Sequence, residues 1–320
     1  MKGLDYVARR VAFGLITLFV AVTLNFVLFR AAPGDAVTNL SRIPHATENT
    51  KRAVAKQFGL DKSKWQQYWI YLGQLAHGNL GISFKNSQPV SKNLRDALGN
   101  TVPMVLLGTT IAIVLGTITG VVAAARRRTF LDYGSVTSAL FFYALPTQWL
   151  ALVLILLFAG TLPSGGRVDD FLFDPSFLTH LKDVLKHMIL PAGTIALTLY
   201  GEYTLVVRSS MLETLGEDYI LTARAKGLSN RRIVWRHAFR NAMLPVATLV
   251  ALSLGYIVAG VILVETVFSW PGVGRAVYLA VVQRDYPMLQ GAFLLLTLSV
   301  VFFNLVADLL YFKLDPRITE

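Results

Sequence analysis

The sequence predicts an all-α polytopic membrane protein. Of its 320 residues, 54% are hydrophobic and only 15% are charged, and the mean hydropathy is +0.53. Soluble domains carry about 25% charged residues, so this composition indicates a chain largely embedded in lipid. Apolar segments long enough to cross about 30 Å of hydrocarbon lie at 11–30, 101–125, 134–161, 188–207, 243–268 and 289–312.

The distribution of lysine and arginine predicts the orientation of these six spans. An even number of spans places both termini on one side of the membrane. Most basic residues of the short connecting segments lie on that same side, including the triplet Arg126–Arg128 and a run between the fourth and fifth spans. Cytoplasmic loops carry an excess of such residues. Both termini are therefore expected to be cytoplasmic, and lipid and topology explain the net charge of +11 without a nucleic acid partner.

The chain divides into three predicted regions. Residues 1–30 form a retained transmembrane helix, because the first apolar run is too long for a signal-peptide core. Residues 31–100 form a small extracytoplasmic cap domain, in which Lys64 to Leu75 carries aromatic residues at helical spacing. Residues 101–320 form a five-helix core, in which Gly116 and Gly120 permit close helix packing.

A few polar residues interrupt the apolar spans or lie at their ends. Such residues face the interior of a helix bundle or a water-filled path, since lipid cannot solvate them. They are therefore either contacts between helices or candidates for a translocation path or gate. The candidates are Glu202, Glu265, Trp270 in the turn WPGVG, and Asn304 and Asp308, which lie one helical turn apart.

The polar segment 209–242 between the fourth and fifth spans predicts a hairpin of two short helices. Asp218 is an acid at a helix start, and Lys226 followed by Gly227 is a helix stop signal. Gly227 is expected to adopt a left-handed conformation, and Ser229 to cap a second helix from Asn230 to about Arg240.

The hairpin also carries features that favour a partner. Ala223 and Gly227 lie four residues apart, so they share a helix face and offer a small-residue surface for close approach. Arg232, Arg236 and Arg240 have the same spacing. Arginines at a helix start are unfavourable, so the pair Arg231–Arg232 indicates an anionic partner. The alternative is an ordinary basic cytoplasmic loop.

The hairpin string DYILTARAKGLSNRRIVWRHAFRNAMLP, from Asp218 to Pro245, resembles the cytoplasmic coupling loop of ABC-importer membrane subunits. It is most similar to the loop of dipeptide and oligopeptide permeases. The strings PGD, GNLGISF, WPGVG and LDPRI resemble the same family. Two positions depart from its pattern: Asn79 replaces an acidic residue, and Leu205 replaces a frequent arginine.

This resemblance implies a six-helix fold of the type I ABC importers and a multi-pass location in a bacterial inner membrane. It implies a second homologous permease, two cytoplasmic ATPase domains on separate chains that bind ATP and Mg²⁺, an extracytoplasmic substrate-binding protein, and a peptide substrate. The cap domain then packs on itself as a lid, docks the binding protein, or does both. The residues implied in ATPase coupling are Asp218, Tyr219, Ala223, Arg224, Gly227, Arg232 and Arg236.

The sequence carries no recognisable catalytic motif. It lacks the phosphate-binding pattern GxxxxGK[ST] and the patterns HExxH and GxSxG, has no cysteine, and scatters its five histidines without metal-ligand spacing. The chain is therefore expected to bind no cofactor or metal and to catalyse nothing by itself. Two alternatives remain open: an ion-driven secondary transporter using Glu202, Glu265 and Asp308, and an ABC importer for a non-peptide solute such as a nickel chelate or glutathione.

Overall fold

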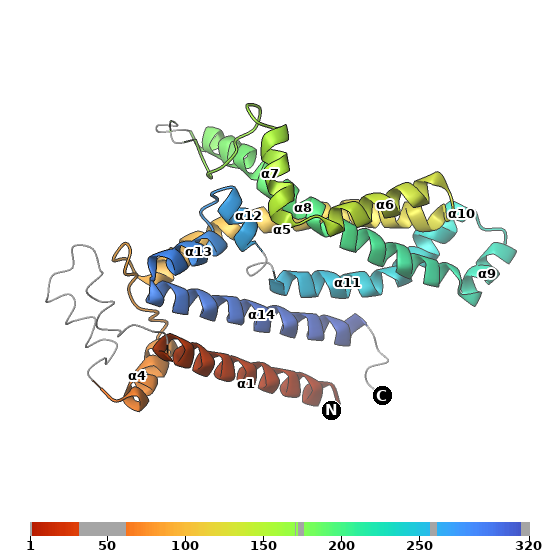
Figure 1. Cartoon of the computed structure of the whole chain (residues 1–320). Coiled ribbons are helices and arrows are strands. Elements are labelled where there is room, and N and C mark those ends of the chain that lie inside the picture. Colours follow the sequence, from red (N-terminus) through yellow and green to blue (C-terminus); the bar gives the residue numbers. More distant parts are fainter. Residues whose placement is uncertain (1, 32–61, 170, 172–175, 257–260, 315–320) are drawn as a thin grey trace. The chain divides into compact units, whose positions relative to one another are not determined.

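The computed structural model describes residues 2–31, 62–169, 171, 176–256 and 261–314 (Figure 1). Residues 32–61 of the expected cap, which include the PGD string Pro33–Asp35, and the tail beyond Leu314 lie outside these ranges. All regular elements among the described residues are helices, joined by turns and loops, and one isolated bridge pairs Ile82 with Pro89. The chain forms two compact units, Met1–Thr101 with Pro271–Leu305 and Val102–Trp270 with Val306–Glu320.

Among the residues that the structure describes, four helices are long and apolar enough to cross a membrane, or five if one bent pair is counted as a span. The four are α1 (Lys2–Ala31), α5 (Val90–Ala125), α8 (Phe177–Leu215) and α14 (Tyr286–Leu314). Each extends beyond the apolar run that predicted it, because polar helix ends continue where the hydrocarbon stops. The start of α8 is fixed locally, since the Ser176 hydroxyl accepts a hydrogen bond from the Thr179 amide.

The third predicted span is not one continuous helix. It is divided into α6 (Phe130–Ala144) and α7 (Thr147–Leu157), which meet at an angle of 105°. Pro146 lies at the break. Proline disfavours the helical conformation in the residue before it, and Leu145 accordingly has an extended ψ of 131°.

The predicted fifth span, 243–268, corresponds to two helices. These are α11 (Phe239–Tyr256) and α12 (Ile262–Val267), and residues 257–260 between them lie outside the described residues. Pro245 lies inside α11 without ending it.

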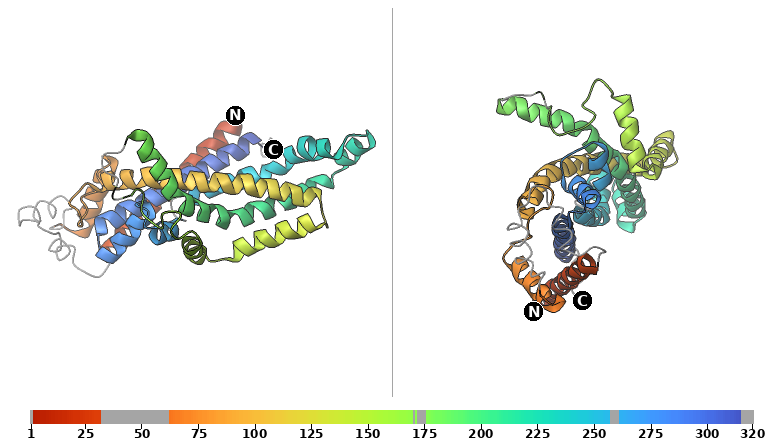
Figure 2. Two further views of the ribbon diagram at one scale, coloured as in Figure 1. Left: turned by 90° about the horizontal axis from the view of Figure 1, so that it is seen from above. Right: turned by 60° about the vertical axis from the view of Figure 1, so that its left-hand side comes forward.

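In the second unit, α6, α7 and α11 pack against α8 (Figures 1 and 2). Glycines allow the close approach of α5 and α8. A Cβ atom added to Gly116 would lie 2.5 Å from the Cβ of Tyr203, and one added to Gly120 would lie 2.7 Å from the carbonyl oxygen of Thr204. The two glycines are therefore packing residues, as the GxxxG spacing predicts. Gly201 on α8 plays the same part against the backbone of Ala139 on α6.

In the first unit, α1 and the first part of α14 lie antiparallel. Gly14 lies against Val301 near one end, and the ring of Phe29 contacts that of Tyr286 near the other. Asn25 fixes the register by donating a hydrogen bond of 2.9 Å to the carbonyl oxygen of Gln290. The unit also holds α4 (Lys64–Ala76) and α13 (Val273–Gln283).

Candidate functional site: the hairpin and an outer cavity

The first arm of the hairpin is α9 (Asp218–Ala225), which follows α8 after Gly216 and Glu217. It ends with two hydrogen bonds, from the Gly227 amide to the Arg224 carbonyl (2.9 Å) and from the Leu228 amide to the Ala223 carbonyl (3.3 Å). This pair of bonds is a Schellman motif, which needs a left-handed residue at its centre. Gly227 has a φ of +72°, so the predicted left-handed conformation is confirmed.

The second arm differs from the short helix that the sequence predicts. Ser229 lies at the predicted start, but its side chain makes no capping hydrogen bond. The helix α10 (Asn230–Arg232) continues as a π-helix, η1 (Ile233–Ala238), and then without a break as α11. The predicted end near Arg240 is therefore wrong. Turns of π-helix are rare and occur frequently at functional sites.

The inner face of α9 is buried within the chain. Ile220 and Ala223 belong to one apolar cluster with Ile233 and Ala238 of η1 and Met211 of α8. Only 6% of Ala223 is exposed, whereas Gly227 is exposed and a Cβ atom there would meet nothing within 4 Å. The two small residues thus do not offer one common accessible face. Ala223 permits close packing inside the hairpin.

Tyr219 joins the two arms of the hairpin. Its hydroxyl accepts a hydrogen bond of 2.9 Å from Nδ2 of Asn241 on α11 and donates a long one of 3.4 Å to the carbonyl oxygen of His237. The sequence indicated Tyr219 but not Asn241, because nothing local connects positions 22 residues apart.

The outer face of the hairpin is basic and carries two exposed apolar side chains. Leu221 and Trp235 are 54% and 46% exposed. Trp235 also contacts the ring of Phe239. Tryptophan and arginine are the residues most enriched among the energetic centres of protein interfaces. From Glu217 to Arg240 the exposed charged residues are Glu217, Asp218, Arg224, Lys226, Arg231, Arg232, Arg236 and Arg240.

An ion pair that the sequence did not reveal ties α8 to the first turn of α6. The Arg208 guanidinium donates from Nε to Oδ1 of Asp132 at 2.6 Å, and from its second amino group to Oδ2 at 3.0 Å. The Arg128 amide donates to Oδ2 at 2.9 Å. Asp132 is buried, whereas the side chain of Arg208 is 26% exposed. A buried carboxylate is therefore satisfied by three donors.

The candidates for a path or gate occupy different environments. Glu265 and Trp270 are fully buried at the end of α12, where the Trp270 amide donates to the Glu265 carbonyl oxygen at 2.8 Å. Glu202 is half-buried on α8, and Asp308 is half-buried on α14. Asn304 is exposed on α14. A backbone hydrogen bond therefore joins two of these candidates, Glu265 and Trp270.

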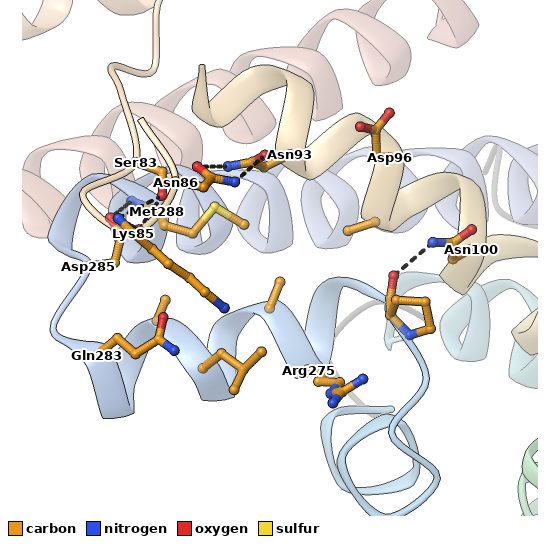
Figure 3. Close-up of a pocket in the computed structure, with 15 residues that line it drawn as sticks. Ser83, Lys85, Asn86, Asn93, Asp96, Asn100, Arg275, Gln283, Asp285 and Met288 are labelled. Carbon is orange, nitrogen blue, oxygen red and sulfur yellow. Dashed lines mark hydrogen bonds between the residues drawn. The ribbon is translucent and has the colours of Figure 1, made fainter. Parts of the chain in front are cut away.

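A polar cavity of about 310 Å³ lies in the first unit between the loop 83–86, the start of α5, and α13 (Figure 3). Lys85 extends into it from the loop, and Arg275 lines it from α13. Beside it, the buried carboxylate of Asp285 organises the loop. It accepts hydrogen bonds from the Ser83 hydroxyl and from the amides of Phe84, Lys85 and Met288, and the last of these caps the start of α14.

Within the described ranges, no group of three or more histidine, cysteine or acidic residues is arranged to hold a metal ion. The long apolar helices and the exposed hairpin between α8 and α11 define a multi-pass membrane protein with a polar surface outside its spans.

Comparison with known proteins identifies the family. Residues 112–320 match the binding-protein-dependent transport system inner membrane component, and residues 3–105 match the N-terminal membrane component of the same systems. The chain belongs to this family of ABC-importer permease subunits, in which the ATPase activity resides in separate subunits.

The relatives are similar along nearly their whole length. The chain is 39% identical to the dipeptide transport system permease protein DppB of Escherichia coli, over 98% of each chain. It is 38% identical to the di/tripeptide transport system permease protein DppB of Pseudomonas aeruginosa, again over 98% of each. It is 34% identical to the oligopeptide transport system permease protein AppB of Bacillus subtilis, over 98% of each.

Proposed function

We propose that this chain forms half of the translocation path of an ATP-driven importer for peptides. A second homologous permease forms the other half, two ATPase domains bind ATP and Mg²⁺ in the cytoplasm, and an extracytoplasmic binding protein delivers the peptide. The peptide substrate is supported by the names of the relatives, which are peptide permeases from three bacteria. The hairpin and both termini lie in the cytoplasm, as the distribution of basic residues predicts.

The observation that carries this proposal is the construction of the hairpin. Its core is buried, its two arms are joined by Tyr219, and its outer face exposes basic and apolar side chains. Such a surface suits a cleft on another protein that is partly acidic and partly apolar. Closure of the ATPases on ATP would displace α9, and the displacement would tilt α8 and α11 between inward-open and outward-open states.

The residues proposed for coupling act in two ways. Arg224, Arg232, Arg236 and Asp218 contact the ATPase from the exposed face. Ala223, Gly227 and Tyr219 keep the hairpin rigid, so that force passes through it. Glu202, Glu265, Trp270, Asn304 and Asp308 are proposed to line or gate the path between the two permeases.

The test uses Trp235→Ala in the assembled transporter. Trp235 is 46% exposed and touches the ring of Phe239, and we expect the hairpin to fold without it. Loss of an interface hot spot worth about 2 kcal/mol weakens ATPase binding about 30-fold. The measurements are the affinity of the purified ATPase for permease in nanodiscs and ATP-dependent uptake of a labelled dipeptide into proteoliposomes. Arg95→Glu, at an exposed site on α5 far along the chain from the hairpin, is the control. Wild-type binding and uptake by the Trp235 variant would contradict the proposal.

The same proteoliposomes separate the alternatives. Uptake that continues without ATP under an ion gradient would indicate the secondary transporter, and uptake of a nickel chelate or glutathione in place of a dipeptide would replace the peptide assignment.

A further inference from the structure

The helix α4 is attached to α1 by aromatic and polar contacts on one of its faces. The hydroxyl groups of Tyr68 and Thr23 are 2.7 Å apart and share a hydrogen bond. The ring of Phe26 meets the ring of Tyr68 edge-on at 5.2 Å and that of Tyr71 at 5.5 Å. Tyr68 and Phe26 are both buried. This face is therefore fixed against the end of a membrane-spanning helix.

The adjoining face of α4 is apolar and exposed. Trp65 is 66% exposed and Trp69 is 57% exposed. Gly73 and Ala76 continue the same stripe at helical spacing and are also exposed. A helix that exposes two tryptophans to water loses the favourable burial of large apolar surfaces, so this stripe fits an apolar environment.

A groove of about 610 Å³ lies between α1 and α4. It is lined mainly by apolar and aromatic groups. Its polar groups are the Thr23 and Tyr68 hydroxyls, which hydrogen-bond to each other, and the ammonium group of Lys64. Among the described residues, Lys64 forms no ion pair with a carboxylate. The lining residues are Phe19, Thr23, Phe26, Val27, Lys64, Trp65, Tyr68 and Trp69.

The depth of the groove identifies its occupant. Its α1 wall, Phe19 to Val27, belongs to the last part of the candidate span Val7–Phe29, so this wall lies at the level of lipid chains. Its α4 wall presents tryptophans, which concentrate where chains meet headgroups. Lys64 lies in the same groove, where a cation attracts an anionic headgroup.

We propose that the groove between α1 and α4 binds an anionic phospholipid, and that α4 lies in the membrane interface. One acyl chain packs along Phe19, Phe26 and Val27 between the two helices, Trp65 and Trp69 border it, and the phosphate group pairs with Lys64. This inference depends on the membrane spans and is independent of the transported solute. It gives part of the predicted cap a function in anchoring, apart from any contact with a binding protein.

The first measurement is tryptophan quenching in the assembled transporter, reconstituted with phosphatidylglycerol brominated either near the headgroup or near the methyl end of its chains. The signal of Trp65 and Trp69 is the difference between wild type and the variant Trp65→Phe/Trp69→Phe. Bromine near the headgroup is expected to quench this difference signal more strongly than bromine near the chain end. If neither lipid quenches it, another protein subunit or another part of this chain covers the groove, and the proposal is wrong.

The second measurement tests the headgroup contact. Lys64→Gln is expected to retain about fivefold less phosphatidylglycerol in native mass spectrometry of the complex, since one lysine contributes about 1 kcal/mol near an anionic surface. Lys92→Gln is the matched control, because Lys92 is an exposed lysine on α5 that does not line the groove. Equal retention by the two variants, or equal loss of phosphatidylcholine and phosphatidylglycerol from Lys64→Gln, would overturn the headgroup assignment.

Discussion

The ion pair between Asp132 and Arg208 allows a quantitative test of how the second unit is held together. Asp132→Asn removes the charge and keeps the size of a buried side chain that accepts three hydrogen bonds. Removing one partner of a fully buried pair costs about 3–5 kcal/mol, and a hydrogen bond to a charged group is worth about 1.5–3 kcal/mol. Because Arg208 is partly exposed, water solvates its freed charge. We therefore expect a loss of about 2–3 kcal/mol.

A double-mutant cycle separates this pair from its surroundings. The variants are Asp132→Asn, Arg208→Gln and the double variant, each unfolded at equilibrium in mixed detergent micelles. If the bidentate contact carries the effect, the double variant loses about as much stability as either single variant, which gives a coupling energy of about 2–3 kcal/mol. Additive losses would refute the reasoning, because they would mean that each side chain contributes through other neighbours.

Three further predictions follow from the backbone and packing of named residues. Gly227→Ala should lower the free energy of unfolding by about 1–2 kcal/mol because of the left-handed φ alone, and Gly227→Asn should lower it less. If the same unfolding assay finds the two variants equally stable, the Schellman assignment is contradicted. Gly116→Ala should lower the free energy of unfolding by about 1–3 kcal/mol, because the added Cβ meets that of Tyr203. The control is Gly193→Ala in the same helix bundle. Its added Cβ meets nothing within 4 Å, so it should raise the free energy of unfolding by up to about 1 kcal/mol. Asp285→Ala should free the loop 83–85, seen as faster hydrogen exchange at the Phe84 and Lys85 amides with little change in α8; unchanged exchange would show that other contacts hold the loop.

The membrane spans could be predicted because a long apolar run has few alternatives to a helix in lipid. The bends within these spans could not be predicted. Pro146 and Pro191 are both prolines in apolar surroundings, yet the chain bends by 105° at the first and continues as one helix through the second. Neighbouring helices decide whether the backbone groups freed by a proline are satisfied, and this information is not local.

In the hairpin, too, features with local causes could be predicted, and features that depend on distant contacts could not. The stop signal at Lys226 and Gly227 was readable, since a Schellman motif depends on a few consecutive residues. The burial of Ala223, the partnership of Tyr219 with Asn241 and the pairing of Asp132 with Arg208 were not. Each depends on contacts between segments far apart in sequence, across 76 residues in the last case. Leu221 and Trp235 could have been singled out as apolar residues within a basic segment.

The construction of the hairpin has a consequence for how force would pass through it. A flexible loop would absorb a displacement, but α9 is closed by a Schellman motif, packed on η1, and bonded through Tyr219 to α11. The second arm enters α11 with no intervening turn, and Asp132 joins α6 to α8. A push on the exposed face would therefore reach α8 and α11 through the buried cluster and the Tyr219 hydroxyl, and α6 through the Asp132–Arg208 pair, whose charge-assisted hydrogen bonds are strong. The π-helical segment η1 is the irregular part of this connection. If it yields first under load, hydrogen exchange in the ATP-bound transporter should change at Ile233–Ala238 while the α9 amides stay protected.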